Sequence, residues 1–374
     1  MSRYRVGFAM YNGKGFATHN MNLYKYAQRD PEIDMVWTTI GAGELPERYQ
    51  QLPRLVGTQL ALLDEAAPLL KQWDDLDAIV VEDAPRLFAL MTLRKMVFDR
   101  HQRGPLLILY QDYAPLRDAN LLGWYGYHTS RSSLPGRLSY AAQCWVAQHA
   151  DRCILFSNWA REMMVHECGV ADERAFVIKP GSDLELWHYQ PRVRSDNNRP
   201  HILFVGGDFQ RKGGDLLLTI FREQFAHQAE LDLVTKQIDT DDLPPSVHLY
   251  TDINANDPRL RQLYAQADLF VLPTRADFSS LAAIEAMAVG LPVIISKVGG
   301  TTEIVRDGET GFLITSDDVE GLRSSLGHLL TDAALRQRMG AAGRATVEQE
   351  FNSAANVTEL LTLIKEACNA GATA

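Results

Sequence analysis

The chain alternates short apolar runs with longer segments in which apolar residues recur every three or four positions. The short runs are rich in Val, Ile and Leu without polar alternation, which predicts strands in sheets that are covered on both faces. Strands are expected at residues 5–10, 35–40, 78–82, 106–111, 152–157, 175–179, 201–207, 231–235, 247–251, 269–273, 292–296 and 312–315. Helices are expected at residues 16–29, 86–102, 139–149, 214–227, 258–267, 280–289, 301–306 and 319–328. This alternation predicts an α/β protein with doubly wound parallel sheets.

The rhythm of strands and helices is interrupted once, at YQPRVRSDNNRP (189–200). This segment is polar, charged and bracketed by prolines, which is typical of a linker. We therefore expect an N-terminal domain over residues 1–190 and a second, similar domain over 200–345. The last stretch, within 346–374, predicts an amphipathic helix. Because ligands of such sheets bind beyond the carboxyl ends of the strands, functional residues are expected in the loops that follow strands.

Composition narrows the class of protein. The net charge of -10 argues against a nucleic-acid binder, because such proteins usually present a basic face to phosphates. The four cysteines lack CxxC pairing and the ten histidines lack metal-ligand spacing, so we expect free thiols and no metal. Neither a signal peptide nor an apolar stretch of roughly 18 residues is evident. We expect a cytoplasmic protein, with peripheral contact at the inner membrane surface left open.

The most informative stretch is LFVLPTRADFSSLAAIEAMAVGLPVIISKVGGTTEIVRDGETGFLI (269–314). A strand is followed by a polar loop with Asp277, and then by a helix of small residues that carries Glu285. The free N–H groups at the start of this helix suit a diphosphate. The residues that would bind the ligand carrying this diphosphate are Ser279, Ser280 and Leu281. Glu285 can accept hydrogen bonds from vicinal hydroxyls, and Asp277 can accept them from a sugar. A solvated Glu and a loop Asp are the alternative interpretation.

A second stretch, HILFVGGDFQRKGGDLLL (201–218), runs from a strand through a glycine turn to Arg211 and Lys212. Two cations at a strand end, beside the start of a helix, can neutralise the β-phosphate of a leaving nucleoside diphosphate. The stretch therefore predicts a phosphate site, and a solvated basic loop is the alternative for Arg211.

Loops of the first half carry weaker signals. Gly13 and Gly15 follow the first strand, where backbone amides could approach a phosphate or an acceptor, although GxGxxG is absent and an ordinary turn is the alternative. Gln111 and Asp112 stand at the end of the strand 106–111. The next loop gathers aromatic residues, namely Trp124, Tyr125, Tyr127 and His128. Aromatic faces suit sugar rings or lipid chains, so we expect a second substrate, the acceptor, to bind here. The alternative is that these aromatic side chains pack in the core or in a lid.

The stretch 269–314 resembles the retaining family 4 glycosyltransferases of GT-B fold, whose signature is an acidic residue, seven residues and then Glu. The matching residues are Glu285-Ala286-Met287-Ala288, Gly290, Pro292-Val293, Gly299-Gly300, Glu303-Ile304-Val305, Gly308 and Gly311-Phe312-Leu313. The resemblance implies two Rossmann-like domains that face each other across a cleft. It also implies that the C-terminal domain binds the nucleotide sugar and that the last helix packs back toward the first domain.

The resemblance further implies roles for single residues. Glu285 would bind the nucleotide ribose, the residue at 277 the donor sugar, and Lys212 the diphosphate. Asp277 stands where the family usually has Glu, and Gly207 stands where it usually has Arg. Arg211 would then replace that Arg, which makes Arg211, Lys212 and Asp277 the expected catalytic residues and Gly207 part of the donor site.

On the acceptor side, the family often has His-Asp at the end of this strand, and its His touches the donor sugar. Gln111 occupies the position of that His, and Asp112 matches the Asp. The family uses a glycine-rich loop, here with Gly13 and Gly15, to close over the donor. GT-B members generally work without a bound metal, so no cofactor is expected.

We therefore predict a retaining glycosyltransferase that moves a hexose-type sugar from a nucleotide diphosphate sugar to a hydroxyl of a glycan, lipid or small molecule. Alternatives are an epimerase or phosphorylase of the same fold, or a degenerate protein that binds a nucleotide sugar without turnover. The basic, apolar segment 86–103 would suit a lipid acceptor. The sequence does not define the base, the sugar, the acceptor, the linkage or the oligomeric state.

Overall fold

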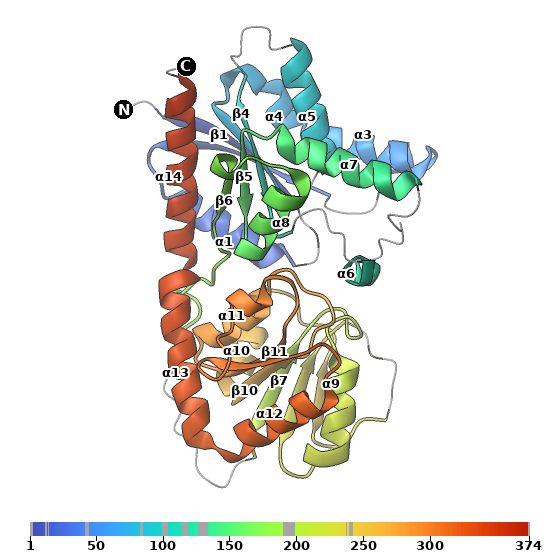
Figure 1. The fold of residues 1–374 in the computed structure, drawn as a ribbon, viewed down its shortest axis with the longest axis vertical. Coiled ribbons are helices and arrows are strands. Elements are labelled where there is room, and N and C mark those ends of the chain that lie inside the picture. The colour runs from blue at the N-terminus through green and yellow to red at the C-terminus, as the bar shows by residue number, and fades with distance from the viewer. Residues whose placement is uncertain are drawn as a thin grey trace. The chain divides into compact units, whose positions relative to one another are not determined.

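A computed structural model describes the chain in two compact units, each built on a six-stranded sheet (Figure 1). The described residues are 3–11, 13, 15–41, 45–82, 85–98, 104–113, 119–125, 134–189, 199–236, 238 and 242–372. Unit 1 comprises Met1–Ala119, His128–Lys179 and Ala354–Ala374, and unit 2 comprises Asn120–Tyr127 and Pro180–Ser353. The predicted linker 189–200 lies mostly outside the described residues, and the predicted domain limits stay a prediction.

The sheet of unit 1 is entirely parallel, with strand order β2-β1-β3-β4-β5-β6. Its strands are β1 (Tyr4–Tyr11), β2 (Ile33–Ile40), β3 (Ala78–Glu82), β4 (Leu106–Gln111), β5 (Arg152–Leu155) and β6 (Ala175–Val177). β5 is shorter than predicted because Ser157 accepts a hydrogen bond from Ala160 N and so begins the next helix. The strand order changes direction between β1 and β3, which makes this the switch point of the sheet.

Helices cover both faces of this sheet. They are α1 (Ala17–Ala27), α2 (Glu47–Gln50), α3 (Arg54–Glu65), α4 (Ala67–Lys71), α5 (Pro85–Phe98), α7 (Leu134–Gln148), α8 (Asn158–Cys168) and α14 (Ser353–Ala372), with 3-10 turns at Trp73–Asp75 and Asp172–Arg174. Ile79 and Val81 join the core under α3, α4, α5, α7 and α8, whereas Ala78 and Val80 join the core under α1 and α14. Because both faces are buried, β3 is apolar throughout, as the sequence pattern predicted.

Unit 2 repeats the architecture, with strand order β12-β11-β10-β7-β8-β9 and parallel pairing throughout. The strands are β7 (His201–Val205), β8 (Glu230–Val234), β9 (Val247–Tyr250), β10 (Leu269–Leu272), β11 (Val293–Ser296) and β12 (Gly311–Ile314). The switch point of this sheet lies between β7 and β10, so the loops after these two strands flank the expected ligand position.

The helices of unit 2 are α6 (Ala119–Trp124), α9 (Gly214–Ile220) with a π-helical turn at Phe221–Phe225, α10 (Pro258–Gln266), α11 (Leu281–Ala288), α12 (Val319–Thr331) and α13 (Ala333–Glu350). The sequence pattern did not predict α13, and it placed Trp124 in a loop, whereas Trp124 ends α6. The helix predicted at 301–306 is wrong, because Gly299–Glu303 forms a short 3-10 turn instead. Gly299 has a φ of +52°, and a side chain there would collide with the Asp277 carbonyl. The backbone therefore turns around that carbonyl before a helix can form.

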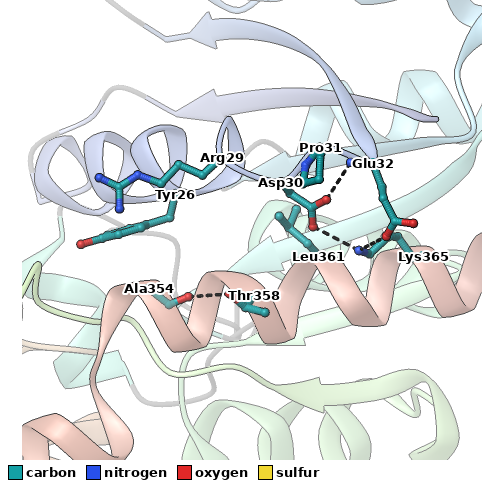
Figure 2. A pocket seen from close by; sticks show the side chains of 9 residues that line it. All are labelled: Tyr26, Arg29, Asp30, Pro31, Glu32, Ala354, Thr358, Leu361 and Lys365. Carbon is teal, nitrogen blue, oxygen red and sulfur yellow. Dashed lines mark hydrogen bonds and ion pairs between the residues drawn. The ribbon is translucent and has the colours of Figure 1, made fainter. Parts of the chain in front are cut away.

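A pocket of about 530 Å³ in unit 1 lies between α14 and the turn from α1 to β2 (Figure 2). Its lining residues are Tyr26, Arg29, Asp30, Pro31, Glu32, Ala354, Thr358, Leu361 and Lys365. Lys365 Nζ lies 3.1 Å from Asp30 Oδ2 and 2.9 Å from Glu32 Oε2. These two acids compensate the charge of Lys365, and the ion pairs connect α14 to the segment that precedes β2. No residue predicted for the functional site lines this pocket.

Candidate functional site

The switch point of unit 2 brings together the predicted cation and acid. Lys212 follows β7 and Asp277 follows β10, and Lys212 Nζ lies 2.5 Å from Asp277 Oδ2. Only 15% of the Lys212 side chain and 7% of the Asp277 side chain are exposed. Burial lowers the pKa of Lys212, and the charge of Asp277 offsets part of this shift. An anion that approaches Lys212 must therefore compete with the carboxylate of Asp277.

Arg211 lies beside this ion pair and is held by several contacts. Its Nη1 donates to the carbonyl of Ala276 at 2.9 Å and to the Tyr125 hydroxyl at 3.3 Å. Its Nε lies 3.3 Å from Asp208 Oδ2. The guanidinium also stands 4.7 Å from the centre of the Tyr125 ring, and that ring stacks on Phe278 at 4.5 Å. Tyr125, predicted for the acceptor side, thus lies on the cationic loop of unit 2.

Arg275 connects the loops at this edge of the sheet, and sequence reasoning missed it. Its backbone N–H donates to the Arg211 carbonyl at 2.8 Å, and its guanidinium binds both carboxylate oxygens of Asp215 at 2.7 and 3.0 Å. Its Nε lies 2.8 Å from Asp317 Oδ1, and the guanidinium stands over the Trp124 ring at 5.5 Å. Both acidic partners are distant in sequence, so no local signal distinguished Arg275 from a solvated arginine.

The start of α11 lies next to Asp277, as the sequence predicted. The Ser280 hydroxyl accepts from Ala283 N at 3.3 Å and caps the helix, with Ser279 before it and Leu281 after it. The loop after β11 packs against this region, because Gly300 N donates to the Phe278 carbonyl at 3.0 Å. The glycine pair of the motif thus allows two backbones to approach closely.

Glu285 lies on α11 and is buried, with 6% of its surface exposed. Burial raises the pKa of Glu285 to about 8, and a hydrogen bond with Tyr264 offsets part of that rise. The same Tyr264 hydroxyl donates to the Ala282 carbonyl at 3.0 Å. Glu285 is therefore mostly protonated at neutral pH.

The glycine turn after β7 contains two different kinds of glycine. A side chain at Gly206 would meet Lys212 Cβ at 2.8 Å, so glycine at this position leaves room for the lysine stem. A side chain at Gly207 would meet only Lys236 Cγ, at 3.9 Å. The space around Gly207 therefore does not explain why glycine stands where the family usually has Arg. Sequence reasoning singled out Gly207 and missed Gly206.

The remaining predicted residues lie in unit 1. A side chain at Gly13 would collide with the Tyr11 ring, and Gly15 has a φ of +109°, which favours glycine. Gln111 is buried and donates to the Tyr113 carbonyl at 2.6 Å, and Asp112 is half-buried. The predicted acceptor-side residues are thus divided between the units, because Trp124 and Tyr125 belong to unit 2. Tyr127 and His128 lie outside the described residues.

Unit 1 holds a buried polar cluster at its own switch point that the sequence analysis did not identify. His19 Nε2 lies 2.9 Å from the Tyr110 hydroxyl and 3.8 Å from Glu82 Oε1. Burial lowers the pKa of His19 to about 3, so the ring is neutral at physiological pH. Glu82 Oε2 accepts from Tyr11 N at 3.1 Å, and Asn20 Nδ2 donates to the Tyr11 carbonyl at 2.8 Å. The cluster therefore fixes the backbone just before the glycine loop.

Among the described residues, no group of three or more His, Cys, Asp or Glu side chains is arranged to hold a metal ion. Among the same residues, no helix has the length and apolar character to cross a membrane.

Residues 199–332 match the family described as glycosyl transferases group 1. The chain is 29% identical over 262 residues to the alpha-maltose-1-phosphate synthase of Mycobacterium tuberculosis, which covers 61% of this chain and 67% of that protein. It is 30% identical over 260 residues to the D-inositol 3-phosphate glycosyltransferase 1 of Catenulispora acidiphila, or 62% of this chain and 61% of that one. The match to an MMP alpha-(1->4)-mannosyltransferase of Mycolicibacterium hassiacum, at 31% identity, spans 55% of this chain and 52% of the relative.

Solved structures extend the similarity to nearly the whole chain. The sucrose-phosphate synthase of Thermosynechococcus elongatus matches with a TM-score of 0.74 at 20% identity, over 98% of this chain and 100% of that one. Anabaena HepE, solved in complex with UDP-glucose, matches with a TM-score of 0.70 at 18% identity, over 97% of this chain and 99% of that one. The predicted fold is confirmed, because the chain has the GT-B fold, and its residues 199–332 match glycosyl transferases group 1.

Proposed function

We propose that this glycosyltransferase is a retaining enzyme of the family 4 type that transfers a hexose-type sugar from a nucleotide diphosphate sugar to an acceptor hydroxyl. The observation that supports this proposal most is the buried Lys212–Asp277 pair beside Arg211 and the start of α11. A cation for phosphate, an acid for sugar hydroxyls and a helix N-terminus thus meet at one edge of one sheet. HepE, one of the similar proteins of known structure, was solved in complex with UDP-glucose, which supports a nucleotide-sugar donor.

In the proposed reaction, the bond between the anomeric carbon and the β-phosphate oxygen breaks while the acceptor oxygen bonds to that carbon from the same face. Lys212 and Arg211 stabilise the negative charge that develops on the leaving diphosphate. The β-phosphate accepts the proton of the acceptor hydroxyl, so no protein base is required. Because two side-chain cations surround the phosphate position, the proposal includes no metal ion.

Donor binding redistributes charge in the proposed site. The diphosphate takes Lys212 from Asp277, and Asp277 then accepts hydrogen bonds from the donor sugar. Glu285 accepts hydrogen bonds from the ribose, which favours its ionised form over the protonated form of the empty protein. The acceptor is a glycan, a lipid or a small molecule, and a cytoplasmic location is part of the same proposal.

A two-step experiment tests this function. First, nucleoside diphosphates and their hexose conjugates are screened by the shift in Tm of the full chain, and one base is expected to raise Tm clearly. Glu285→Ala should abolish that shift, whereas the exposed Glu309→Ala serves as the matched control. No stabilisation by any nucleotide in the panel would contradict the proposal.

The second step measures product formation with the donor identified in the first step. Transfer to an acceptor panel with retention of anomeric configuration, followed by NMR of the product, supports the proposal. Conversion of the donor without an acceptor would instead identify an epimerase, and a phosphate requirement would identify a phosphorylase. Binding without turnover on any acceptor would favour a degenerate, nucleotide-sugar-binding protein.

A further inference from the structure

The outer helical layer of unit 1 exposes apolar stripes on three neighbouring helices. Within this layer α5 packs against both α3 and α7 (Figure 1). The exposed side chains are Val56 and Leu60 on α3, Leu90, Leu93 and Met96 on α5, and Leu134 and Leu138 on α7. They recur every three or four residues, so each stripe follows one side of its helix. Leu134 and Leu138 are more than 60% exposed, and we call this surface the α5–α7 face.

Exposed apolar residues are distributed differently in the two units. Across the described residues, unit 2 exposes Leu186 and Tyr189 in the segment before β7, Val319 at the start of α12 and Trp124 at the end of α6. Single exposed apolar residues are normal on a soluble protein, whereas a contiguous group marks a binding surface. The α5–α7 face is such a group, because its side chains come from helices in mutual contact.

Charge on the same helices is one-sided. α5 and α7, 14 and 15 residues long, contain Arg86, Arg94, Lys95 and Arg137 and no Asp or Glu. With 47 acids among 374 residues, a stretch of this combined length would carry about three or four at average frequency. Arg137 is exposed, Arg94 lies over the Trp73 ring, and Lys95 reaches Asp151 at 2.7 Å. α5 and α7 thus carry no acid although the net charge of the chain is -10, and on α3 the exposed Asp64 pairs with Arg48 while Glu65 accepts from Gly41 N.

We propose that the α5–α7 face docks on the surface of an anionic lipid bilayer. Leucine and methionine side chains would enter the boundary between headgroups and acyl chains, and the basic residues would contact lipid phosphates. At about 1.5 Å per residue, helices of this length reach about 21 Å, less than the roughly 30 Å of a hydrocarbon core. They therefore lie along the membrane surface and do not cross it.

The charges favour a bilayer over a second copy of the chain. In a two-fold dimer through this face, the same surface meets itself, so Arg137 and its basic neighbours would approach like charges. α5 and α7 carry no acid, and Asp64 of α3 is already paired with Arg48, so these cations would lack an uncommitted partner in the other copy. An anionic bilayer supplies the opposite charge continuously, so it satisfies the apolar and the charged residues at once.

Co-sedimentation of the full chain with lipid vesicles tests the docking. Binding is expected to vesicles of phosphatidylcholine with about one third phosphatidylglycerol, and to weaken strongly with pure phosphatidylcholine or at high salt. The double substitution Leu134→Glu with Leu138→Glu should reduce the partition coefficient at least about tenfold, because two acids replace apolar contacts. Arg137→Gln should reduce it about fivefold. Val319→Glu, on α12 of unit 2, is the matched control and should change nothing.

Circular dichroism and Tm establish that each variant is folded, and size-exclusion chromatography with light scattering reports its mass. Equal vesicle binding by the wild type and the double variant would overturn the proposal, as would absence of binding to anionic vesicles. A wild-type dimer that the double variant dissociates would assign the face to a second copy instead. Vesicle binding needs no nucleotide, so this result is independent of whether the proposed transfer reaction is correct.

Discussion

Unit 1 and unit 2 place very different side chains at equivalent points of the same sheet architecture. At the switch point of unit 2, charged residues form a network in which Lys212 meets Asp277 and Arg275 meets Asp215. At the switch point of unit 1, a neutral imidazole and a tyrosine hydroxyl form a buried cluster with Glu82. The comparison teaches that the fold supplies the position and the loop residues supply the chemistry. Four changes can break or sharpen this contrast.

The largest effect is expected at the cation of unit 2. Lys212→Ala should lower kcat/KM for transfer by a factor of about 10² to 10³, because a positioned charge opposite the leaving phosphate is lost. Steady-state kinetics with the donor found by nucleotide screening measure this loss. The exposed Lys71, in unit 1, offers the control Lys71→Ala, which should keep normal turnover. Equal activity of the two variants would remove Lys212 from the mechanism.

A second effect concerns the stability of unit 2 at alkaline pH. Because the pKa of Glu285 is about 8 in the folded protein and near 4.5 when unfolded, the folded state binds the extra proton between these values. The free energy of unfolding should therefore fall as pH rises from about 4.5 to 8. Glu285→Gln should remove this fall, with a gain on the order of 3 kcal/mol at pH 7 in the empty protein.

Urea unfolding at pH 5, 7 and 8.5 measures the effect of Glu285→Gln. The variant and the wild type should agree most closely at pH 5 and diverge as the pH rises. A constant difference across the three pH values would show that the substitution acts through packing and not through ionisation.

The opposite dependence of the free energy of unfolding on pH is expected in unit 1. The pKa of His19 is about 3 in the folded protein against an ordinary value of 6.5, so the unfolded state binds more protons between these values. Stability should be complete above pH 6.5 and should be lost as the pH falls toward 3. His19→Gln should reduce this loss of stability at acid pH by about 3 kcal/mol at pH 4.5. Urea unfolding from pH 4 to 7 tests it, and an unchanged slope would contradict the assignment.

The smallest effect is expected for a substitution of Asp277, which tests whether this acid competes with phosphate for Lys212. Asp277→Asn keeps a hydrogen-bond acceptor for Lys212 but removes the charge that competes with phosphate. Affinity for the free nucleoside diphosphate should rise about tenfold while transfer falls. Isothermal titration calorimetry measures the affinity, and Asp208→Asn, at a half-exposed carboxylate near Arg211, is the matched control with a smaller effect. Weaker diphosphate binding by Asp277→Asn would contradict the proposed competition.

Sequence reasoning located the strands of both sheets because their apolar runs are continuous and buried on both faces. It placed Lys212 and Asp277 at one edge of the sheet because each stands in the loop that follows such a run. It did not locate Arg275, whose partners Asp215 and Asp317 are 60 and 42 residues away, or the cluster around His19. Pairings of this kind depend on how distant loops meet, and no local periodicity encodes them.

The 3-10 turn at Gly299–Glu303 shows the same limit at the level of secondary structure. Its residues favour a helix by pattern, but the turn must first pass the carbonyl of Asp277, and only a glycine fits there. A tertiary contact thus overrides the local preference.

The chain order of the two units has a practical consequence for dissecting the enzyme. Asn120–Tyr127 lies within the stretch that otherwise builds unit 1, yet it belongs to unit 2, and Ala354–Ala374 returns to unit 1. A fragment that starts at residue 200 would lack the Tyr125 ring on Arg211, and one that stops at 190 would lack the helix that covers a face of its sheet. Neither half can be expressed as an intact module by a single cut, so truncation will report on folding before it reports on catalysis.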